Sequence, residues 1–278
     1  MIRALPRIPL YGLVILWILA MISVPIVDWT LGNAALSTAV SIGVLLQVIA
    51  VCRIVVVAWG LRRMLLTFGV ILALAWLTEY IGHTTGFPFG RYAYTPLLQP
   101  QLGGVPLLIP LAWLMMLPPA WAVAHIITRK DSLTPQPPLQ TNLTPQPPLQ
   151  MERGRQAQPV DVKFVIVSAL AFTAWDLFLD PQMVAWDLWR WAEPSGYFGI
   201  PFSNYAGWLL ASSVLTVIAS RFAPIRQLPT RPLVIIYAIT WVLEMVGLAV
   251  FWGLPAPALV GFAAMGLMLL WAWRRGRE

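Results

Sequence analysis

Four acidic residues lie inside long apolar stretches of the sequence, where an ionisable side chain is costly: Glu79, Asp176, Asp180 and Glu244. Such residues usually mark a functional site when the stretch crosses a membrane. Asp176 and Asp180 are four positions apart, so a helix places them on one face. Because two carboxyl groups this close in an apolar setting do not both ionise readily, the pair predicts a proton donor beside a proton acceptor. Pro181 follows directly, and we expect the helix to end or bend there.

Each of these acids also has a purely structural interpretation. Asp180 would then be a hydrated residue that ends its helix. Glu79 would form a structural hydrogen bond between helices, and the partners within its reach are His83, at i+4 spacing, Arg91 and Glu244. A carboxylate paired with an imidazole can instead shuttle protons. The spacing alone leaves both interpretations open.

Two loops rich in glycine and aromatic residues follow Glu79 and Asp180 along the chain. GHTTGFPFGRYAYT covers 82–95, and WDLWRWAEPSGYFGIPFSNYAGW covers 186–208. The three tryptophans near the start of the second loop predict a short helix at the membrane interface, and Asn204 is placed to cap the next span or to hold a water. The residues expected to line a binding site around the acids are Arg91, Tyr92, Tyr94, Trp175, Trp186 and Asn204.

The elements that must position these residues are membrane helices. Of the 278 residues, 59% are hydrophobic and only 10% are charged, whereas a soluble domain carries about 25% charged residues. The composition therefore excludes an ordinary soluble enzyme. A helix needs about 20 apolar residues to span the hydrocarbon core. The stretches that meet this requirement are 8–27, 34–53, 64–82, 104–127, 162–179, 205–222, 231–252 and 256–273. We predict an all-α, polytopic bundle of about eight transmembrane helices.

Basic residues are concentrated on one side of this predicted topology. Of the 18 Lys and Arg residues, only Arg91 and Arg190 fall on the other side. The positive-inside rule then places both termini in the cytoplasm and the protein in the cell (cytoplasmic) membrane. The net charge of +7 reflects this orientation and does not indicate a nucleic acid partner. All four acids fall in the non-cytoplasmic half of the membrane, beside the two aromatic loops, which favours one shared site.

We treat 1–278 as a single membrane domain that contains a proline-rich segment at 129–160. LTPQPPLQ occurs at 133–140 and again at 143–150, which predicts an extended, disordered cytoplasmic loop. This loop separates the chain into two halves of four spans. The pattern Trp-x-x-Glu-x-x-Gly occurs around Glu79 and around Glu244. Either a duplication that produced the two halves of the chain or a coincidence explains this repeat.

Four strings of the sequence resemble the integral-membrane carotenoid biosynthesis family. They are TEYIGHTTGFPFGRYAYT at 78–95, LGGVPLLIPLAW at 102–113, AWDLFLDPQMVAWDLWRW at 174–191 and GYFGIPFSNYAGW at 196–208. The characterised members of this family include carotenoid 1,2-hydratases and bisanhydrobacterioruberin hydratases. The resemblance implies that water is added to the terminal double bond of an acyclic carotenoid ψ-end, giving a tertiary alcohol. It implies no redox cofactor and no metal ion.

The residues fit this chemistry. Protonation of C2 of the terminal alkene gives a tertiary cation at C1, which requires a neutral carboxylic acid and which aromatic faces stabilise. We assign Asp176 as the leading acid, with Asp180 or Glu79 orienting the water, Glu244 ranked third, and His83 as a further proton acceptor. The expected partners are a lipid-soluble carotenoid, water, the bilayer and other carotenoid-pathway enzymes. The alternatives are a carotenoid cyclase or elongase and a non-catalytic carotenoid carrier or transporter.

Overall fold

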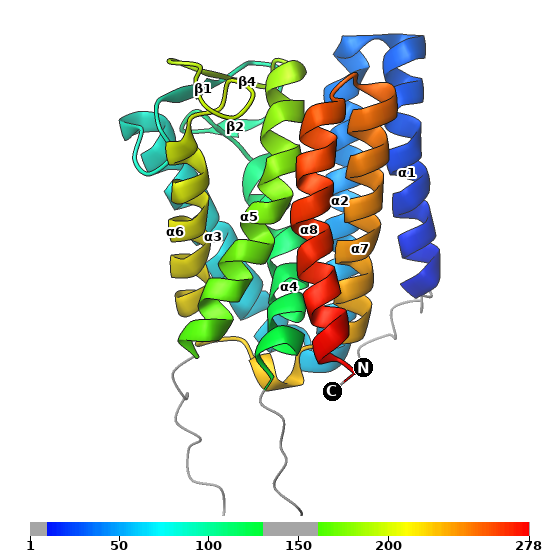
Figure 1. The fold of residues 1–278 in the computed structure, drawn as a ribbon, viewed down its shortest axis with the longest axis vertical. Coiled ribbons are helices and arrows are strands. Elements are labelled where there is room, and N and C mark those ends of the chain that lie inside the picture. Colours follow the sequence, from blue (N-terminus) through cyan, green and yellow to red (C-terminus); the bar gives the residue numbers. More distant parts are fainter. Residues whose placement is uncertain (1–9, 130–160, 278) are drawn as a thin grey trace, which may run out of the picture.

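The computed structural model describes residues 10–129 and 161–277, so the predicted proline-rich loop lies outside the described residues, apart from its first residue. Within them, the chain forms eight helices that are long and apolar enough to cross a membrane, which confirms the all-α prediction (Figure 1). The helices are α1 (Leu10–Leu31), α2 (Asn33–Trp59), α3 (Leu61–Thr85), α4 (Leu108–Thr128), α5 (Val162–Ala185), α6 (Phe202–Ala219), α7 (Thr230–Val246) and α8 (Pro255–Arg275). A π-helical stretch, Gly247–Phe251, extends α7.

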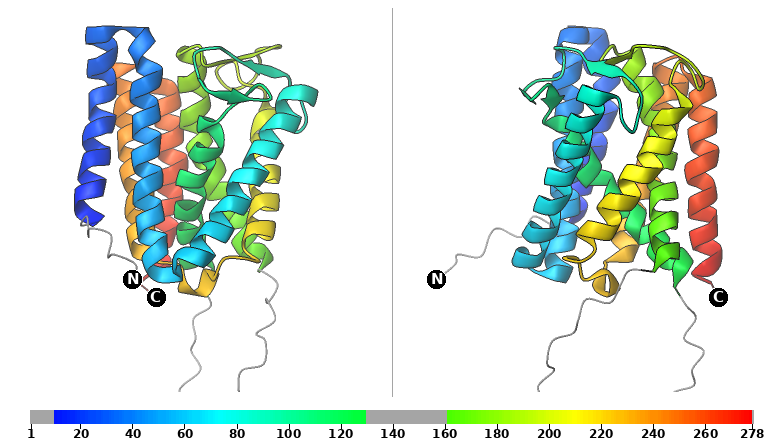
Figure 2. Two further views of the ribbon diagram at one scale, coloured as in Figure 1. Left: turned by 180° about the vertical axis from the view of Figure 1, so that it is seen from behind. Right: turned by 90° about the vertical axis from the view of Figure 1, so that its left-hand side faces the viewer.

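Helix α4 is at the centre of the bundle. It packs against α2 and α3 from the first half of the chain and against α5, α7 and α8 from the second. Most of its residues are buried, as expected for a helix that is apolar on all sides. The two sequence halves are therefore packed into one bundle. Helix α1 packs mainly on α2 and lies at the edge (Figure 2).

The two ends of the bundle differ. The first turn of α1 and the last turn of α8 lie at one end, together with the ends of α4 and α5 that border the segment outside the described residues (Figure 1). A 3-10 turn at Ile225–Gln227 connects α6 to α7 at this end. The opposite end carries the two aromatic loops and four short strands: β1 (Tyr92–Tyr94), β2 (Gln101–Leu102), β3 (Val105–Pro106) and β4 (Trp189–Trp191). The acids and aromatic loops thus lie away from the end where α1 begins and α8 ends.

Strand β1 pairs antiparallel with β4, so that Tyr92 lies opposite Trp191 and Tyr94 opposite Trp189. The prediction of a short interfacial helix in this part of the second loop is wrong. Aromatic residues alternate with Ala93 in β1 and with Arg190 in β4, and this period of two belongs to a strand. Pairing of the two strands ties the two aromatic loops together.

Of the two outcomes predicted for Pro181, an end or a bend of the helix, the end does not occur, because helix α5 continues past Pro181 to Ala185. A proline inside a helix leaves the carbonyl four residues earlier without its usual donor, which here is the carbonyl of Leu177. The hydroxyl of Tyr197 donates to that carbonyl at 3.1 Å and takes the place of the missing N–H. Asp180 is therefore held within a continuous helix and is not a hydrated residue at a helix end.

Candidate active site

A cavity of about 160 Å³ opens inside the bundle beside the β1–β4 pair. Side chains from α1 to α7 and from both aromatic loops contribute to its mainly apolar lining. The tryptophans in this lining are Trp17, Trp113, Trp175, Trp186, Trp189, Trp191, Trp208 and Trp252. Three of the four predicted acids, Glu79, Asp180 and Glu244, line the same cavity. Carboxyl groups that are distant in the sequence therefore share one aromatic chamber.

Glu79 accepts hydrogen bonds from three side chains. The hydroxyls of Tyr92 and Tyr94 each donate to its Oε2 at 2.7 Å, and Nε1 of Trp113 donates to its Oε1 at 3.0 Å. Because all three partners donate, the pattern suits a carboxylate, which only accepts. Burial, together with the nearby Glu79, raises the pKa of both tyrosine hydroxyls well above the usual range, so they keep their protons and act as donors.

The β1–β4 pair positions the aromatic residues around Glu79. The two tyrosines of β1 and the two tryptophans of β4 line the cavity. Arg190, between those tryptophans, is exposed and forms an ion pair with Asp187. The Arg190 guanidinium holds the pKa of the Asp187 carboxyl below its usual value. The strand alternation thus sends the aromatic side chains inward and Arg190, with its partner Asp187, outward.

Asn204 joins the two aspartates of α5. Its Nδ2 donates to Oδ2 of Asp176 at 3.1 Å and also to Oδ2 of Asp180. The prediction that Asn204 caps its span is wrong, because α6 begins at Phe202 and the asparagine lies inside the first turn. From there its amide reaches α5. Asp176, Asp180 and Asn204 are all buried, with at most 2% exposure.

The two aspartates differ in their access to the cavity. Asp180 lines the cavity and interacts with the Trp189 indole and with Asp176. Asp176, one helical turn earlier, is not among the lining residues. Its Oδ1 has no hydrogen-bond partner among the residues that the structure describes. Two buried carboxyl groups in contact tend to share one proton, so the pair can act as an acid whose cavity-facing member is Asp180.

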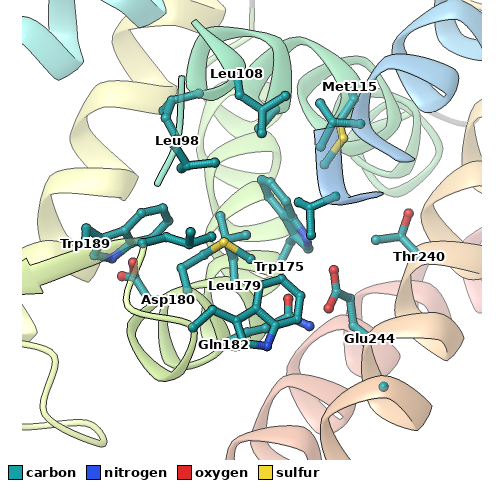
Figure 3. A pocket seen from close by; sticks show the side chains of 18 of the residues that line it. Leu98, Leu108, Met115, Trp175, Leu179, Asp180, Gln182, Trp189, Thr240 and Glu244 are labelled. Carbon is teal, nitrogen blue, oxygen red and sulfur yellow. The ribbon is translucent and has the colours of Figure 1, made fainter. Parts of the chain in front are cut away.

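Glu244 lies on the side of the cavity away from Asp180 (Figure 3). It projects from α7 just before the π-helical stretch, a feature frequent at functional sites. The Trp175 indole N–H interacts with its carboxyl group, although Nε1 has no partner within normal hydrogen-bond geometry in the described part of the chain. A buried acid beside a weakly bonded N–H makes a polar site that suits a water or a hydroxyl group.

Besides Asp176, two of the predicted residues, His83 and Arg91, lie away from the cavity lining. His83 packs against the tyrosine rings of β1, with ring centroids 6.5 and 6.0 Å apart, while the hydrogen bonds of Glu79 go to other side chains. Arg91 is exposed and forms no ion pair with any described residue. Trp186, in contrast, lines the cavity and packs edge-on against Trp252, with ring centroids 4.8 Å apart.

Reasoning from the sequence missed an aromatic wall and a buried amide. Trp113 stacks on Trp208 with ring centroids 4.8 Å apart, and Phe172 packs against both at 5.0 and 5.3 Å. Gln47 of α2 lines the cavity and donates to Oγ1 of Thr240 at 3.2 Å. Trp113 and Trp208 each end one of the four strings that carry the family resemblance, but no local spacing links these residues to the acids.

These features define a polytopic membrane protein with an acid-bearing, tryptophan-rich cavity among its helices. The chain matches the family described as carotenoid biosynthesis protein over residues 38–268, and it therefore belongs to that family. A curated relative, the bisanhydrobacterioruberin hydratase of Haloarcula japonica, is 28% identical over 202 residues. The match covers 70% of this chain and 59% of the relative, less than two thirds of its length. No solved structure matches the chain.

Proposed function

We propose that this protein adds water to the terminal double bond of an acyclic carotenoid, giving a tertiary alcohol. The observation that carries the proposal is the placement of Asp180 and Glu244 on opposite sides of one tryptophan-rich cavity (Figure 3). Family membership and the name of the relative support this substrate class and reaction. We place the protein in the cytoplasmic membrane with both termini in the cytoplasm, because basic residues are concentrated at the end of the bundle where α1 begins and α8 ends.

Asp180 is the group that delivers the proton. An alkene is protonated by a neutral acid that is held against it in an apolar site. Asp180 lines the cavity, while Asp176 contacts it from outside the lining and shares its proton. Asn204 donates to both carboxyl groups and fixes their relative position. Asp176 and Asn204 therefore have positioning roles, which reverses the order of the two aspartates expected from the sequence.

Protonation at C2 leaves a tertiary cation at C1, which the cavity wall stabilises. The indole faces of Trp113 and Trp208 provide cation–π attraction, about 2 kcal/mol for a desolvated cation. Glu79 lies on the same wall, and its three donors hold it as an acceptor. The negative charge of Glu79 stabilises the cation electrostatically, and Glu79 does not itself transfer a proton.

Water attacks C1 as Glu244 accepts a proton from it. Nε1 of Trp175, beside Glu244, is a donor for the oxygen of that water. The new C–H bond forms at C2 and the new C–O bond at C1, so the product gains one water. The proton taken up by Glu244 returns to Asp180 through water in the cavity, which completes the cycle.

The test is to express wild-type protein, Asp180→Asn and Glu244→Gln in a host that accumulates an acyclic carotene, and to analyse its pigments by mass spectrometry. We expect the wild type to produce a compound heavier by one water, and each variant to be slower by about a hundred- to ten-thousand-fold. Asp187→Asn is the matched control, because its carboxyl group is exposed at the surface. The amount of each protein in the membrane is measured in parallel.

The outcomes separate the proposal from its alternatives. Undiminished hydration by Asp180→Asn would remove Asp180 from the donor role. A cyclase would produce a compound of unchanged mass. A carrier would retain pigment and yield no new compound, with no dependence on either acid.

A further inference from the structure

We infer that the polyene chain of the substrate lies in an apolar groove between α1 and α7 and reaches the cavity sideways from the membrane. The inference rests on the proposed function for the class of its ligand, a long unsaturated hydrocarbon. It concerns the part of the substrate that does not react.

The cavity is too small for a whole carotenoid. Its volume of about 160 Å³ is close to that of an engineered protein cavity of roughly 150 Å³ that binds benzene. Such a space accepts one isoprenoid end group. The long remainder of the substrate must therefore leave the cavity through an opening.

The opening lies between α1 and the C-terminal part of α7. Three residues that line the cavity there are large, apolar and exposed: Ile22 of α1 is 50% exposed, Val246 of α7 is 43% exposed, and Phe251 of the π-helical stretch is 38% exposed. All three belong to membrane-spanning segments, so their exposed surfaces face lipid. The cavity therefore opens toward acyl chains.

A groove of about 430 Å³ continues along the same two helices. Its lining residues are Ile18, Ile235, Ala238, Ile239, Val242 and Leu243. Leu243 lines both the groove and the cavity, so the two spaces are adjacent. From Ile235 to Leu243 the groove follows about two turns of α7, roughly 12 Å. Every lining side chain is a hydrocarbon, which suits a polyene and offers no group to bind a polar lipid head.

The position of α1 keeps this groove free of protein side chains. Helix α1 packs mainly on α2 and has few contacts with α7, although the two helices run side by side (Figure 1). Pro25 of α1, which also lines the cavity, removes one backbone hydrogen bond near the opening. A hydrocarbon chain that begins in the cavity thus has one continuous apolar path, from the reacting end group to the lipid-facing surface.

The test fills the groove from either wall. Ala238→Trp does so from α7, and Ile18→Trp does so from α1. Ala263→Trp is the matched control, because Ala263 is exposed on α8 and lines neither space. Each purified protein is reconstituted in lipid nanodiscs with an acyclic carotene. Bound pigment is measured by visible absorbance and hydrated product by mass spectrometry.

We expect both groove variants to bind pigment about tenfold more weakly and to raise KM by a similar factor, with kcat unchanged. The control should match the wild type. Wild-type pigment affinity in the folded groove variants would overturn the inference, and Ala238→Leu provides a milder block in case the tryptophan variants do not fold. If the wild-type protein binds pigment and forms no hydrated product, the proposed hydration is overturned. The binding data would still decide whether the polyene chain lies in the groove.

Discussion

Replacing Tyr94 by phenylalanine tests how the Glu79 cluster is held together. The change removes one hydroxyl that donates at 2.7 Å to a carboxyl group whose residue is only 4% exposed, so water does not readily replace it. Hydrogen bonds to charged groups contribute about 1.5–3 kcal/mol in soluble proteins. In membrane bundles, side-chain hydrogen bonds average about 0.6 kcal/mol and reach about 1.7. We expect Tyr94→Phe to lower the free energy of unfolding by about 1–2 kcal/mol.

Glu79→Gln tests the contribution of the charge at the same site. A glutamine oxygen still accepts from the tyrosines, but its amide nitrogen then faces the N–H of Trp113, donor against donor. We expect Glu79→Gln to lower the free energy of unfolding by about 2–4 kcal/mol. In this background, Tyr94→Phe removes only a neutral hydrogen bond and should cost about 0.5–1 kcal/mol. The two substitutions should therefore be coupled by about 1 kcal/mol.

The assay is denaturant unfolding of the wild type, both single variants and the double variant in mixed micelles. Tryptophan fluorescence reports unfolding, since the chain has 15 Trp. Tyr11→Phe is the matched control, because Tyr11 is 81% exposed on α1 and should leave stability unchanged. Equal costs of Tyr94→Phe in the two backgrounds would refute the charge-assisted arrangement around Glu79.

Three further predictions concern the supports of the site. Gly207→Ala would bring a new Cβ to 2.7 Å from the Phe89 ring. We expect this clash to lower the free energy of unfolding by about 1–3 kcal/mol and so to lower the thermal midpoint; an unchanged midpoint would contradict the close approach. Tyr197→Phe leaves the Leu177 carbonyl without its substitute donor and should cost about 1 kcal/mol in the same unfolding assay; no cost would show that this hydroxyl does not support α5. Asp176→Asn should lower kcat about tenfold, shift the pH profile of kcat and leave KM unchanged. A decrease in kcat as large as that of Asp180→Asn would instead give Asp176 a direct role in proton transfer.

Much of the fold follows from local properties of the sequence. Span number depends on apolar length, and the eight predicted spans are all present among the described residues. The expectation that acids from separate spans share one site also follows from topology, because it places Glu79, Asp180 and Glu244 at one depth. The structure places these three on one cavity.

The remaining features depend on contacts between distant segments. In the sequence, the pairing of Tyr92–Tyr94 with Trp189–Trp191 is indicated only by two short strings in which aromatic residues alternate with other residues. Because tryptophan is frequent at membrane interfaces, the sequence alone predicts an interfacial helix for the second string. The continuation of α5 past Pro181 depends on a donor from Tyr197 in another loop. Which aspartate faces the cavity depends on how α5 is rotated against its neighbours, and four-residue spacing gives no information on that rotation.

The most direct test of proton-initiated hydration is to follow the oxygen and the carbon-bound hydrogen that the added water supplies. Purified protein is incubated with an acyclic carotene, first in water labelled with heavy oxygen and separately in deuterium oxide, and the product is analysed by mass spectrometry and NMR. We predict one labelled oxygen at C1 and one deuterium at C2, and at least about a hundredfold less of each labelled product with Asp180→Asn. A product that carries deuterium without the labelled oxygen, or oxygen without deuterium at C2, would contradict the account.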